Sequence, residues 1–289
     1  MDTEKVKKGL FQNVELEEQL FDKGYIVLPF FSEEQVAQLK HFYSTVHPGT
    51  AVSTDGRLHG IHMTTWASNQ GYKLLVGEFI RHIFDKACQK WFRNHRHLNH
   101  VFIAKEPGTE TEFDVHQDWS VVDENQHYSV NIWCPMHDVS KENGALWILP
   151  GSHRLDQPIR GAGYLFPNYH QEMDTLKDHV QCIDVKAGEA LIFFHSTIHG
   201  SPPNNSSENR VVACCTVIDE DAPLRTYYQN GESDPLSVYQ PKDDFMYGYR
   251  DIMNESVSRP PLGKLIETRE PYKLNKVELD DLIGLCQPG

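Results

Sequence analysis

The sequence predicts a mainly β domain, an antiparallel sandwich or barrel with helices packed on its outside. Helical spacing of apolar residues dominates the chain up to about residue 98, and short β-branched and aromatic runs follow over about 99–220. The sequence shows no internal repeat and no clear linker. We therefore expect one domain over 1–289, with a helical part at about 1–98, a β core at about 99–220 and a C-terminal extension at 221–289.

Two helices are expected in the N-terminal part. The segment 32–47 begins with a capping box, in which Ser32 serves as the N-cap and Gln35 follows three residues later. A longer helix is predicted over 71–93, because apolar residues recur there at a spacing of three to four. These residues are Leu75, Phe79, Ile83, Ala87 and Trp91.

The strands of the core are expected in six runs rich in β-branched and aromatic residues, separated by turn dipeptides such as Asn143-Gly144. The insertion 152–179 has the length of a lid or binding loop. The polar tail 219–289 carries an aromatic cluster and could wrap the domain, form an interface or cover the site. The six runs are 101–104, 128–134, 145–149, 180–185, 190–194 and 211–218.

Charge and hydropathy exclude two classes of partner. The chain has 41 acidic and 27 basic residues, a net charge of −14, and such a field repels the phosphates of nucleic acid. No run approaches the roughly 20 apolar residues that a membrane span needs. The N-terminus M-D-T-E-K-V-K-K-G-L lacks the hydrophobic block of a signal peptide, so a cytoplasmic location is expected.

The six cysteines form no C-x-x-C pair, and three of them lie in apolar strand-like runs. Free buried thiols in a reducing compartment fit this pattern better than disulfides or a zinc site.

A histidine and an aspartate two residues apart point to a metal. The stretch T-E-F-D-V-H-Q-D-W-S places His116 and Asp118 at i and i+2 of an expected strand, where both side chains share a face. His195 and His199 each offer a third ligand. Two histidines and one carboxylate form the facial triad of non-haem Fe(II) sites. By itself, however, such a pair is more often part of a solvated strand face, because histidines and acids are common in this chain.

An arginine enters the apolar run V-V-A-C-C-T-V-I at Arg210. A buried guanidinium is costly unless it meets an anion, and its planar fork suits a carboxylate. Ser201 could add a hydroxyl to the same carboxylate. The alternative partner is an acid of the protein itself, such as Glu208 or Asp219.

Four segments then occur in the order that one enzyme family shows. They are F-D-K-G-Y-I-V-L-P-F-F-S-E-E-Q-V, K-E-P-G-T-E-T-E-F-D-V-H-Q-D-W, N-G-A-L-W-I-L-P-G-S-H-R, and G-E-A-L-I-F-F-H-S-T-I-H-G-S followed by N-R. Together they resemble the phytanoyl-CoA dioxygenase family of Fe(II)- and 2-oxoglutarate-dependent oxygenases, over most of the chain. The resemblance implies a double-stranded β-helix, the jelly roll of cupin-like proteins.

Carried over by position, the resemblance implies His116, Asp118 and His199 as iron ligands and catalytic centre. His195 would then have a packing or supporting role, because the family places the ligand directly before Gly-Ser. Arg210 would bind the distal carboxylate of 2-oxoglutarate.

The same resemblance implies further contacts with the co-substrate. Ser201 would lie beside the distal carboxylate, and Trp133 matches a family tryptophan once one residue of spacing is absorbed. Lys105 would contact co-substrate or substrate, or be a solvated strand residue. Substrate-pocket residues are expected among His59, His62, Trp66 and Trp119.

The implied reaction is hydroxylation, or a related oxidation, of an unactivated C–H bond in a small metabolite. Fe(II), 2-oxoglutarate and dioxygen would be required, succinate and CO2 would be released, and ascorbate could stimulate turnover. We expect a small-molecule substrate, no nucleic-acid or membrane partner, and a monomer or homodimer. Two alternatives are a non-catalytic metal- and 2-oxoglutarate-binding jelly roll and a metal-dependent hydrolase, and the hydrolase gives Arg210 no role.

Overall fold

The structure is a computed structural model, and seven stretches of it are described below. These are residues 9–48, 55–166, 169, 173–176, 178–248, 263–274 and 284.

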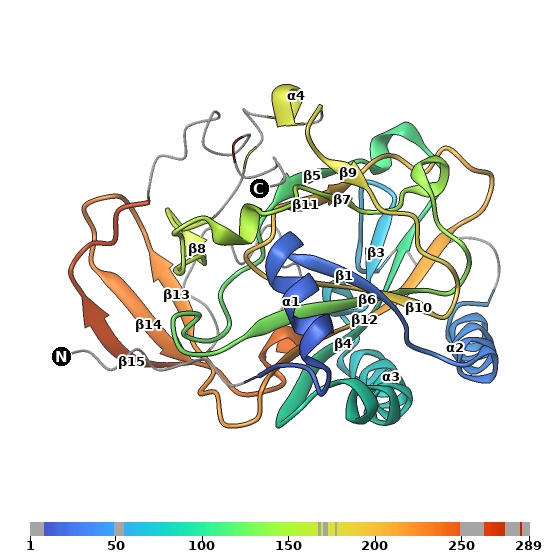
Figure 1. Ribbon diagram of the computed structural model, residues 1–289, viewed down its shortest axis with the longest axis horizontal. Helices are drawn as coiled ribbons and strands as arrows, with labels where there is room; N and C mark the ends of the chain where they lie inside the picture. Colours follow the sequence, from blue (N-terminus) through green and yellow to red (C-terminus); the bar gives the residue numbers. More distant parts are fainter. Residues whose placement is uncertain are drawn as a thin grey trace.

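A seven-stranded sheet forms the centre of the molecule, and all of its strand pairs are antiparallel. Figure 1 shows it crossing the middle of the fold. In spatial order its strands are β1 (Tyr25–Pro29), β10 (Glu189–Phe194), β6 (Ser129–Pro135), β12 (Arg210–Asp219), β4 (His95–Lys105), β3 (Ile61–Met63) and β2 (Arg57–Leu58).

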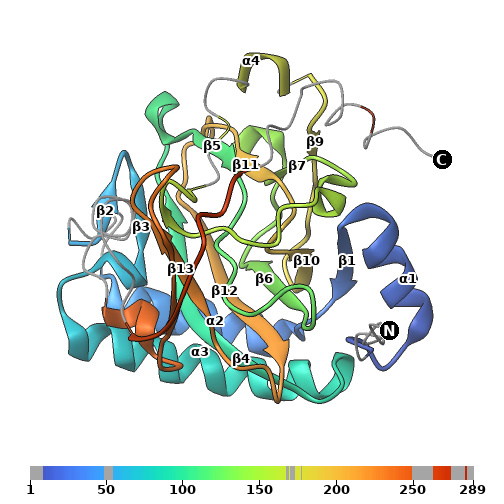
Figure 2. The same ribbon diagram turned by 90° about the vertical axis from the view of Figure 1, so that its left-hand side faces the viewer.

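A second, four-stranded antiparallel sheet packs against the main sheet and carries part of the site (Figure 2). Its strands are short, because each serves mainly to hold a turn or a ligand-bearing residue. In spatial order they are β5 (Phe113–His116), β11 (His199–Ser201), β7 (Trp147–Ile148) and β9 (Gln181–Cys182).

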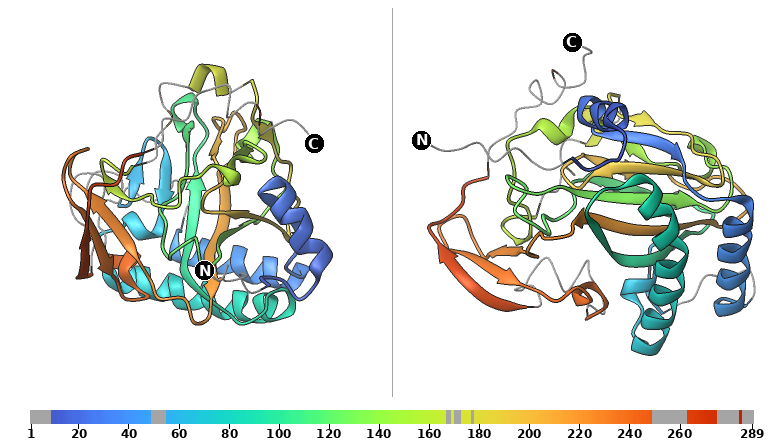
Figure 3. Two further views of the ribbon diagram at one scale, coloured as in Figure 1. Left: turned by 60° about the vertical axis from the view of Figure 1, so that its left-hand side comes forward. Right: turned by 60° about the horizontal axis from the view of Figure 1, so that its bottom comes forward.

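The C-terminal extension forms a third sheet, which the sequence did not predict. It lies to one side of the main sheet in Figures 1 and 3, and one of its pairs, β13 with β8, is parallel. Its strands are β15 (Lys264–Arg269), β14 (Leu236–Gln240), β13 (Thr226–Gln229) and β8 (Ala162–Gly163).

Helices α2 and α3 lie together along one face of the main sheet (Figure 3), whereas α4 lies on the side of the second sheet. Both predicted helices are confirmed, and the Ser32–Gln35 capping box is present. Among the described residues, no helix is both long and apolar enough to cross a membrane. The helices are α1 (Val14–Lys23), α2 (Glu33–Val46), α3 (Gln70–Trp91) and α4 (Met173–Leu176), with 3-10 turns η1 (Thr64–Trp66), η2 (Thr109–Thr111), η3 (Lys141–Asn143), η4 (Ser152–Arg154) and η6 (Phe245–Gly248).

Strand β12 explains the long apolar run of the sequence, because all ten of its residues are buried. Val211, Ala213 and Cys215 face the helices in one core cluster, whereas Val212 and Cys214 face the second sheet in another. A strand covered on both faces reads as a continuous hydrophobic run, and the alternation of faces is set by the pleat.

Several predicted boundaries were wrong at the second sheet. The runs 145–149 and 180–185 contain only the two-residue strands β7 and β9. The remaining residues of 145–149 are buried, so their apolar character reflects burial rather than strand pairing. In 180–185 only Val185 is buried, and it forms an isolated β-bridge with Val139.

Candidate active site

A cavity of about 490 Å³ lies between the main sheet and the second sheet. That volume is in the range of small-molecule sites. Its walls include all seven of the residues that the sequence selected for iron and co-substrate. They are Lys105, His116, Asp118, Trp133, His199, Ser201 and Arg210.

His116, Asp118 and His199 converge at one point of the cavity wall. The Nε2 atom of His116 lies 3.7 Å from Oδ1 of Asp118, and Nε2 of His199 lies 3.7 Å from Oδ2. The two imidazole rings are 4.4 Å apart, and the three donor atoms all lie within 4.8 Å of one another. Two imidazoles and a carboxylate at this spacing could hold one divalent ion with open positions toward the cavity.

Strand register brings the two histidines together. His116 is the last residue of β5 and His199 the first of β11, and the two are direct partners across the antiparallel pair. Gly200 allows this close approach, since a Cβ there would lie 2.7 Å from the carbonyl oxygen of Phe113. The glycine that follows His199 is therefore required by packing between the strands.

Asp118 reaches the site by a different route from the one expected. Strand β5 ends at His116, so strand alternation does not orient the aspartate, and that prediction was wrong. Instead its backbone N–H donates to the carbonyl of His195, at 3.0 Å, and the neighbouring Gln117 side chain donates to the carbonyl of Ser196. The carbonyls of His195 and Ser196, in the turn before His199, thus hold the backbone of Asp118 and the neighbouring Gln117 in place.

Backbone carbonyls fix the orientation of both imidazoles. Nδ1 of His116 lies 2.9 Å from the carbonyl of Asp114, and Nδ1 of His199 lies 3.0 Å from that of Thr197. A carbonyl can only accept, so each Nδ1 carries a proton, and in the neutral ring the Nε2 lone pair faces Asp118. Histidine ligands of metals are oriented in this way by the hydrogen bond of the other ring nitrogen.

The three groups also shift one another's ionisation. Burial alone would raise the pKa of Asp118, but His199 and His116 hold it well below its usual range. Burial, followed by the charge of His116, lowers the pKa of His199 to about 4. The carboxylate is therefore ionised and His199 is neutral at pH 7, which are the forms that bind a cation.

Asn131 links Asp118 to His195 and was not singled out from the sequence. Its Nδ2 donates to Oδ2 of Asp118, while its Oδ1 faces Nε2 of His195 at 3.0 Å and Oγ1 of Thr216 at 2.9 Å. His195 lies outside the group of three and supports it through this amide. A polar residue inside the apolar run V-N-I-W was the available signal.

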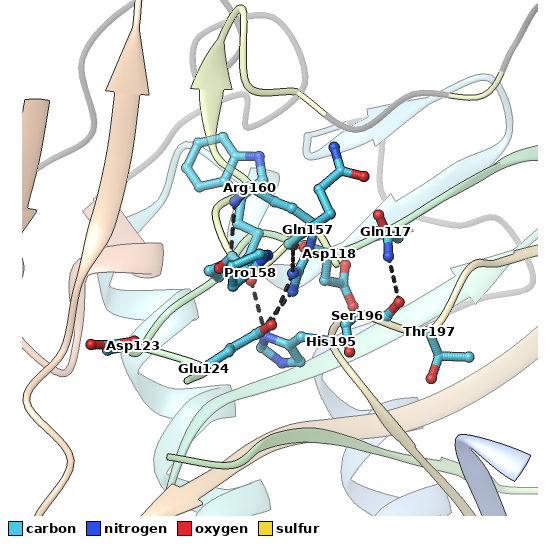
Figure 4. Close-up of polar contacts among 12 residues, drawn as sticks. Gln117, Asp118, Asp123, Glu124, Gln157, Pro158, Arg160, His195, Ser196 and Thr197 are labelled. Atoms are coloured by element: carbon cyan, nitrogen blue, oxygen red, sulfur yellow. Dashed lines mark hydrogen bonds and ion pairs between the residues drawn. The ribbon is translucent and has the colours of Figure 1, made fainter. Parts of the chain in front are cut away.

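Arg160 fastens the Asp118 segment to the long insertion (Figure 4). Its fully buried side chain donates from Nε to the carbonyl of Asp118, at 2.8 Å, and from Nη1 to the carbonyl of Gln157, at 2.7 Å. Both terminal nitrogens bind Glu124, at 2.8 and 2.6 Å. This arginine is therefore a structural element beneath the metal ligands and is not free to bind an anionic substrate.

The other end of the cavity carries two buried cations. Lys105 on β4 and Arg210 on β12 are direct register partners, and both side chains are almost fully buried. Lys105 Nζ donates to Oγ of Ser201, at 2.5 Å, and to the carbonyl of Pro202, at 2.7 Å. The guanidinium of Arg210 lies 5.2 Å from the ring of Trp133.

The guanidinium of Arg210 is not paired with either acid considered from the sequence. Asp219, at the far end of β12, accepts from His127 and from the backbone of Tyr128, at 3.0 and 3.2 Å. Nε and Nη1 of Arg210 are buried and meet no hydrogen-bond partner among the described residues. Orphaned donors of this kind are strongly unfavourable unless an anionic ligand accepts from them.

The pKa values of Lys105 and Arg210 show that burying these two basic groups next to each other is unfavourable. Burial, followed by the charge of Arg210, lowers the pKa of Lys105 to about 6, and burial lowers that of Arg210 to about 10. A carboxylate placed between the two cations would reverse both effects. The solvated alternative for Lys105 is excluded by its burial.

The pocket residues expected from the sequence divide into two groups. His59, Trp66 and Trp119 line the cavity. His62 does not; it is fully buried beside His47, with the two rings 5.3 Å apart. The reason is the alternation of β3, which turns Ile61 and Met63 toward the cavity and His62 away from it.

Comparison with known proteins was made by sequence and by fold. The model of the phytanoyl-CoA dioxygenase (PhyH) family matches residues 21–212. A phytanoyl-CoA dioxygenase of Arabidopsis thaliana is 33% identical over 132 residues, which are 43% of this chain and 44% of that protein. A phytanoyl-CoA dioxygenase domain-containing protein 1 of Danio rerio is 28% identical over 131 residues, 43% of this chain and 45% of that protein. The matched stretch thus spans less than half the length of these relatives.

Solved structures with the same fold include 2-oxoglutarate-dependent proteins. The non-haem α-ketoglutarate-dependent carbocyclase SnoK from nogalamycin biosynthesis is similar with a TM-score of 0.53 and 19% identity, over 76% of this chain and 89% of that one. EctD from S. alaskensis, solved with 2-oxoglutarate and 5-hydroxyectoine, has a TM-score of 0.52 and 18% identity, over 78% and 83% of the two chains. The predicted fold, a double-stranded β-helix with flanking helices, is confirmed.

Proposed function

Because this chain belongs to the phytanoyl-CoA dioxygenase family, we propose that it is an Fe(II)- and 2-oxoglutarate-dependent dioxygenase that oxidises a C–H bond of a small molecule. The observation that carries the proposal is the pairing of two features in one cavity. A triad of two imidazoles and a carboxylate stands at one end, and two buried cations stand at the other. A hydrolase would use the triad but has no need for the cations.

The residues fit both groups. His116, Asp118 and His199 would hold the iron through Nε2, a carboxylate oxygen and Nε2. The distal carboxylate of 2-oxoglutarate would accept hydrogen bonds from Arg210 and Lys105, with the hydroxyl of Ser201 beside them. When bound, iron with its co-substrate supplies the activation of dioxygen, coupled to release of succinate and CO2.

The chain's own contribution is orientation and exclusion of water. Carbonyl-bound imidazoles and the Asn131 amide hold the three ligands before any metal arrives. The paired cations would fix the co-substrate at its far end, so that its other end is directed to the metal. The same burial removes bulk water from the reacting centre.

The walls between the two ends and the surface would select the substrate. They are largely apolar, and the cavity is too small for a macromolecule, so a small molecule with an apolar body is the substrate class we propose. The apolar wall residues include Leu58, Met63, Trp66, Val101, Ile103, Phe113, Trp119, Val121 and Met246.

The proposal is tested by loading the purified full chain with Fe(II) without oxygen and then screening a metabolite library for oxygen-dependent succinate release. Hits are analysed by mass spectrometry for the gain of one oxygen atom. Substrate-stimulated succinate with a matching oxidised product is expected. Activity with Zn²⁺ and none with Fe(II) and 2-oxoglutarate would instead favour a hydrolase.

Binding of the co-substrate is measured separately, so that a missing substrate does not obscure the result. Calorimetric titration of 2-oxoglutarate is carried out with Mn²⁺ in place of Fe(II), and again without metal. Metal-enhanced binding with 1:1 stoichiometry is expected. Binding without any succinate release across a broad library would support the non-catalytic alternative.

A further inference from the structure

A second group of metal-binding side chains lies in the core between α3 and the main sheet, and one of its residues, Cys215, also borders the cavity. Cys88 comes from α3, His97 from β4 and Cys215 from β12. Each offers one donor atom, and the three atoms lie within 4.8 Å of one another. Two cysteine sulfurs and one imidazole, from three separate elements, therefore meet at one point. No spacing of these residues in the sequence indicates such a site.

The imidazole of His97 is held in a defined orientation. Its Nε2 lies 2.8 Å from Oδ1 of Asp85, and its Nδ1 lies 2.6 Å from Nε2 of His100. The side chain of Asp85 is 37% exposed, whereas His100 is 4% exposed. Nε2 therefore faces the surface and donates to a carboxylate, while the Nδ1 lone pair faces the interior.

This arrangement has the features of a supported metal ligand. Histidines bound to zinc almost always donate their other ring N–H to a carboxylate or carbonyl, as His97 does to Asp85. The two cysteines are 0% and 2% exposed, and His100 brings a second ring nitrogen to the same face of the sheet. Two sulfurs and two imidazole nitrogens are the donor set of structural zinc sites.

We propose that Cys88, His97 and Cys215 bind one Zn²⁺-like divalent ion. His100 lies outside this group of three, and its Nε2, 2.6 Å from Nδ1 of His97, would move closer to the two cysteines to become the fourth ligand. Zinc lies about 2.3 Å from sulfur and about 2.0–2.1 Å from nitrogen, so donors around it are about 3.3–3.8 Å apart. The observed spacing of at most 4.8 Å must contract by about 1 Å, and the nitrogens must separate by roughly 0.7 Å. On binding, each cysteine thiol loses its proton to solvent and becomes a thiolate, and His100 takes the tautomer with its proton on Nδ1, so that Nε2 is free to ligate.

Such a site is chemically distinct from the triad in the cavity. Thiolates select zinc-like ions, whereas a carboxylate with imidazoles also suits iron. Four protein ligands leave no position for a substrate, so the ion would be structural and would tie α3 to β4 and β12. The proposal does not depend on the dioxygenase activity.

The test uses the full chain carrying His116→Ala and His199→Ala, which removes the triad, purified metal-free under reducing and anaerobic conditions. It is titrated with Co²⁺, whose absorption reports thiolate ligation, and the Co²⁺ is then displaced with Zn²⁺. We expect one equivalent to bind with a thiolate-to-cobalt charge-transfer band, and Zn²⁺ to raise the melting temperature.

Matched variants then assign the ligands. Cys215→Ala should abolish the charge-transfer band, and Cys182→Ser, a half-buried cysteine on β9, should leave it unchanged. If the Cys215 variant does not fold, the less buried residues His97 and Asp85 are changed instead. His97→Gln should weaken Co²⁺ binding at least tenfold, and Asp85→Asn should weaken it by about tenfold. Absence of a thiolate band in the triad-free protein, or an unchanged band and affinity in the ligand variants, would overturn the proposal.

Discussion

The two ends of the cavity differ in whether their polar side chains have hydrogen-bond partners within the protein. At the metal end, each ligand already has a partner that orients it: carbonyls for His116 and His199 and the Asn131 amide for Asp118. At the other end, the basic side chains of Lys105 and Arg210 are buried side by side, and Nε and Nη1 of the guanidinium meet no hydrogen-bond partner among the described residues.

The metal ligands are held in place before any ligand binds, whereas the basic residues at the other end become stable only when an anion binds. The metal end is preorganised, so binding an ion there requires little rearrangement. The cation end is unfavourable until a dianion arrives, and the relief of that conflict contributes to its affinity. Variants should therefore affect metal affinity at one end, and co-substrate affinity and stability at the other.

The largest effect is expected from Asp118→Ala. Loss of a ligand should lower iron affinity by more than the roughly 10- to 100-fold that loss of a supporting partner costs, and succinate formation should fall to background. Iron content after Fe(II) loading and succinate release are measured, with Glu267→Gln on the exposed strand β15 as control. Undiminished turnover in the Asp118 variant would contradict its assignment as a ligand.

Arg210→Met should weaken binding of the co-substrate and leave metal affinity almost unchanged. Removing one partner of a buried charge pair costs about 2–5 kcal/mol, so the Kd of 2-oxoglutarate should rise by roughly 30-fold or more. Metal affinity should stay within about twofold, because the guanidinium does not contact the triad. Arg210→Lys should recover part of the affinity but not the two-point contact. An unchanged Kd for the co-acid would show that another group binds it.

A smaller effect on iron affinity is expected from removing the buried ion pair of Arg160 and Glu124, which we call the clamp. The double variant Arg160→Met, Glu124→Leu removes the hydrogen bond to the Asp118 carbonyl without leaving a buried charge. Loss of one such bond, about 1–1.5 kcal/mol, should lower iron affinity by about tenfold. Arg160→Met alone should instead destabilise the fold, because Glu124 loses its partner. Wild-type iron affinity in the double variant would show that the segment is held without the clamp.

The smallest effect, and one of opposite sign, is expected from Lys105→Met. Because the pKa of Lys105 is lowered to about 6, its charged form destabilises the folded state. The unfolded chain holds the proton up to about pH 10. The cost is therefore greatest below pH 6 and decreases as the pH rises toward 10. Without co-substrate, the variant should melt at a higher temperature than wild type, most clearly at low pH.

That same variant should lose affinity for 2-oxoglutarate, since a lysine ammonium no longer meets the carboxylate. A melting temperature that is equal to wild type at all pH values would contradict the claim that the charged form of Lys105 destabilises the folded state. A higher melting temperature with unchanged co-substrate affinity would confine Lys105 to a structural role.

The regular part of the fold could be predicted because local patterns express it directly. The capping box at Ser32 and the apolar run of β12 carry their own signals, and both were correct. The third sheet was not predicted, since strands such as β15 are exposed along their whole length and show no buried face in the sequence.

The candidate site could be proposed from the sequence mainly through the resemblance. Arg210 stands out inside an apolar run, but His116 with Asp118 is a weak signal by itself, and the choice of His199 over His195 followed the family pattern. Asn131 and Arg160 were missed as supporting residues, because an asparagine or arginine acquires that role only from what faces it across the fold.

By itself, the sequence determined the residue types, their order and the face that each apolar strand would bury, since these follow from local periodicity. Only the tertiary structure decided that His116 and His199 are register partners, that Asp118 is held by a turn rather than by its strand, and that Cys88 and Cys215 meet at His97. The reason is that contacts between distant segments depend on strand pairing and helix packing, which no local pattern specifies.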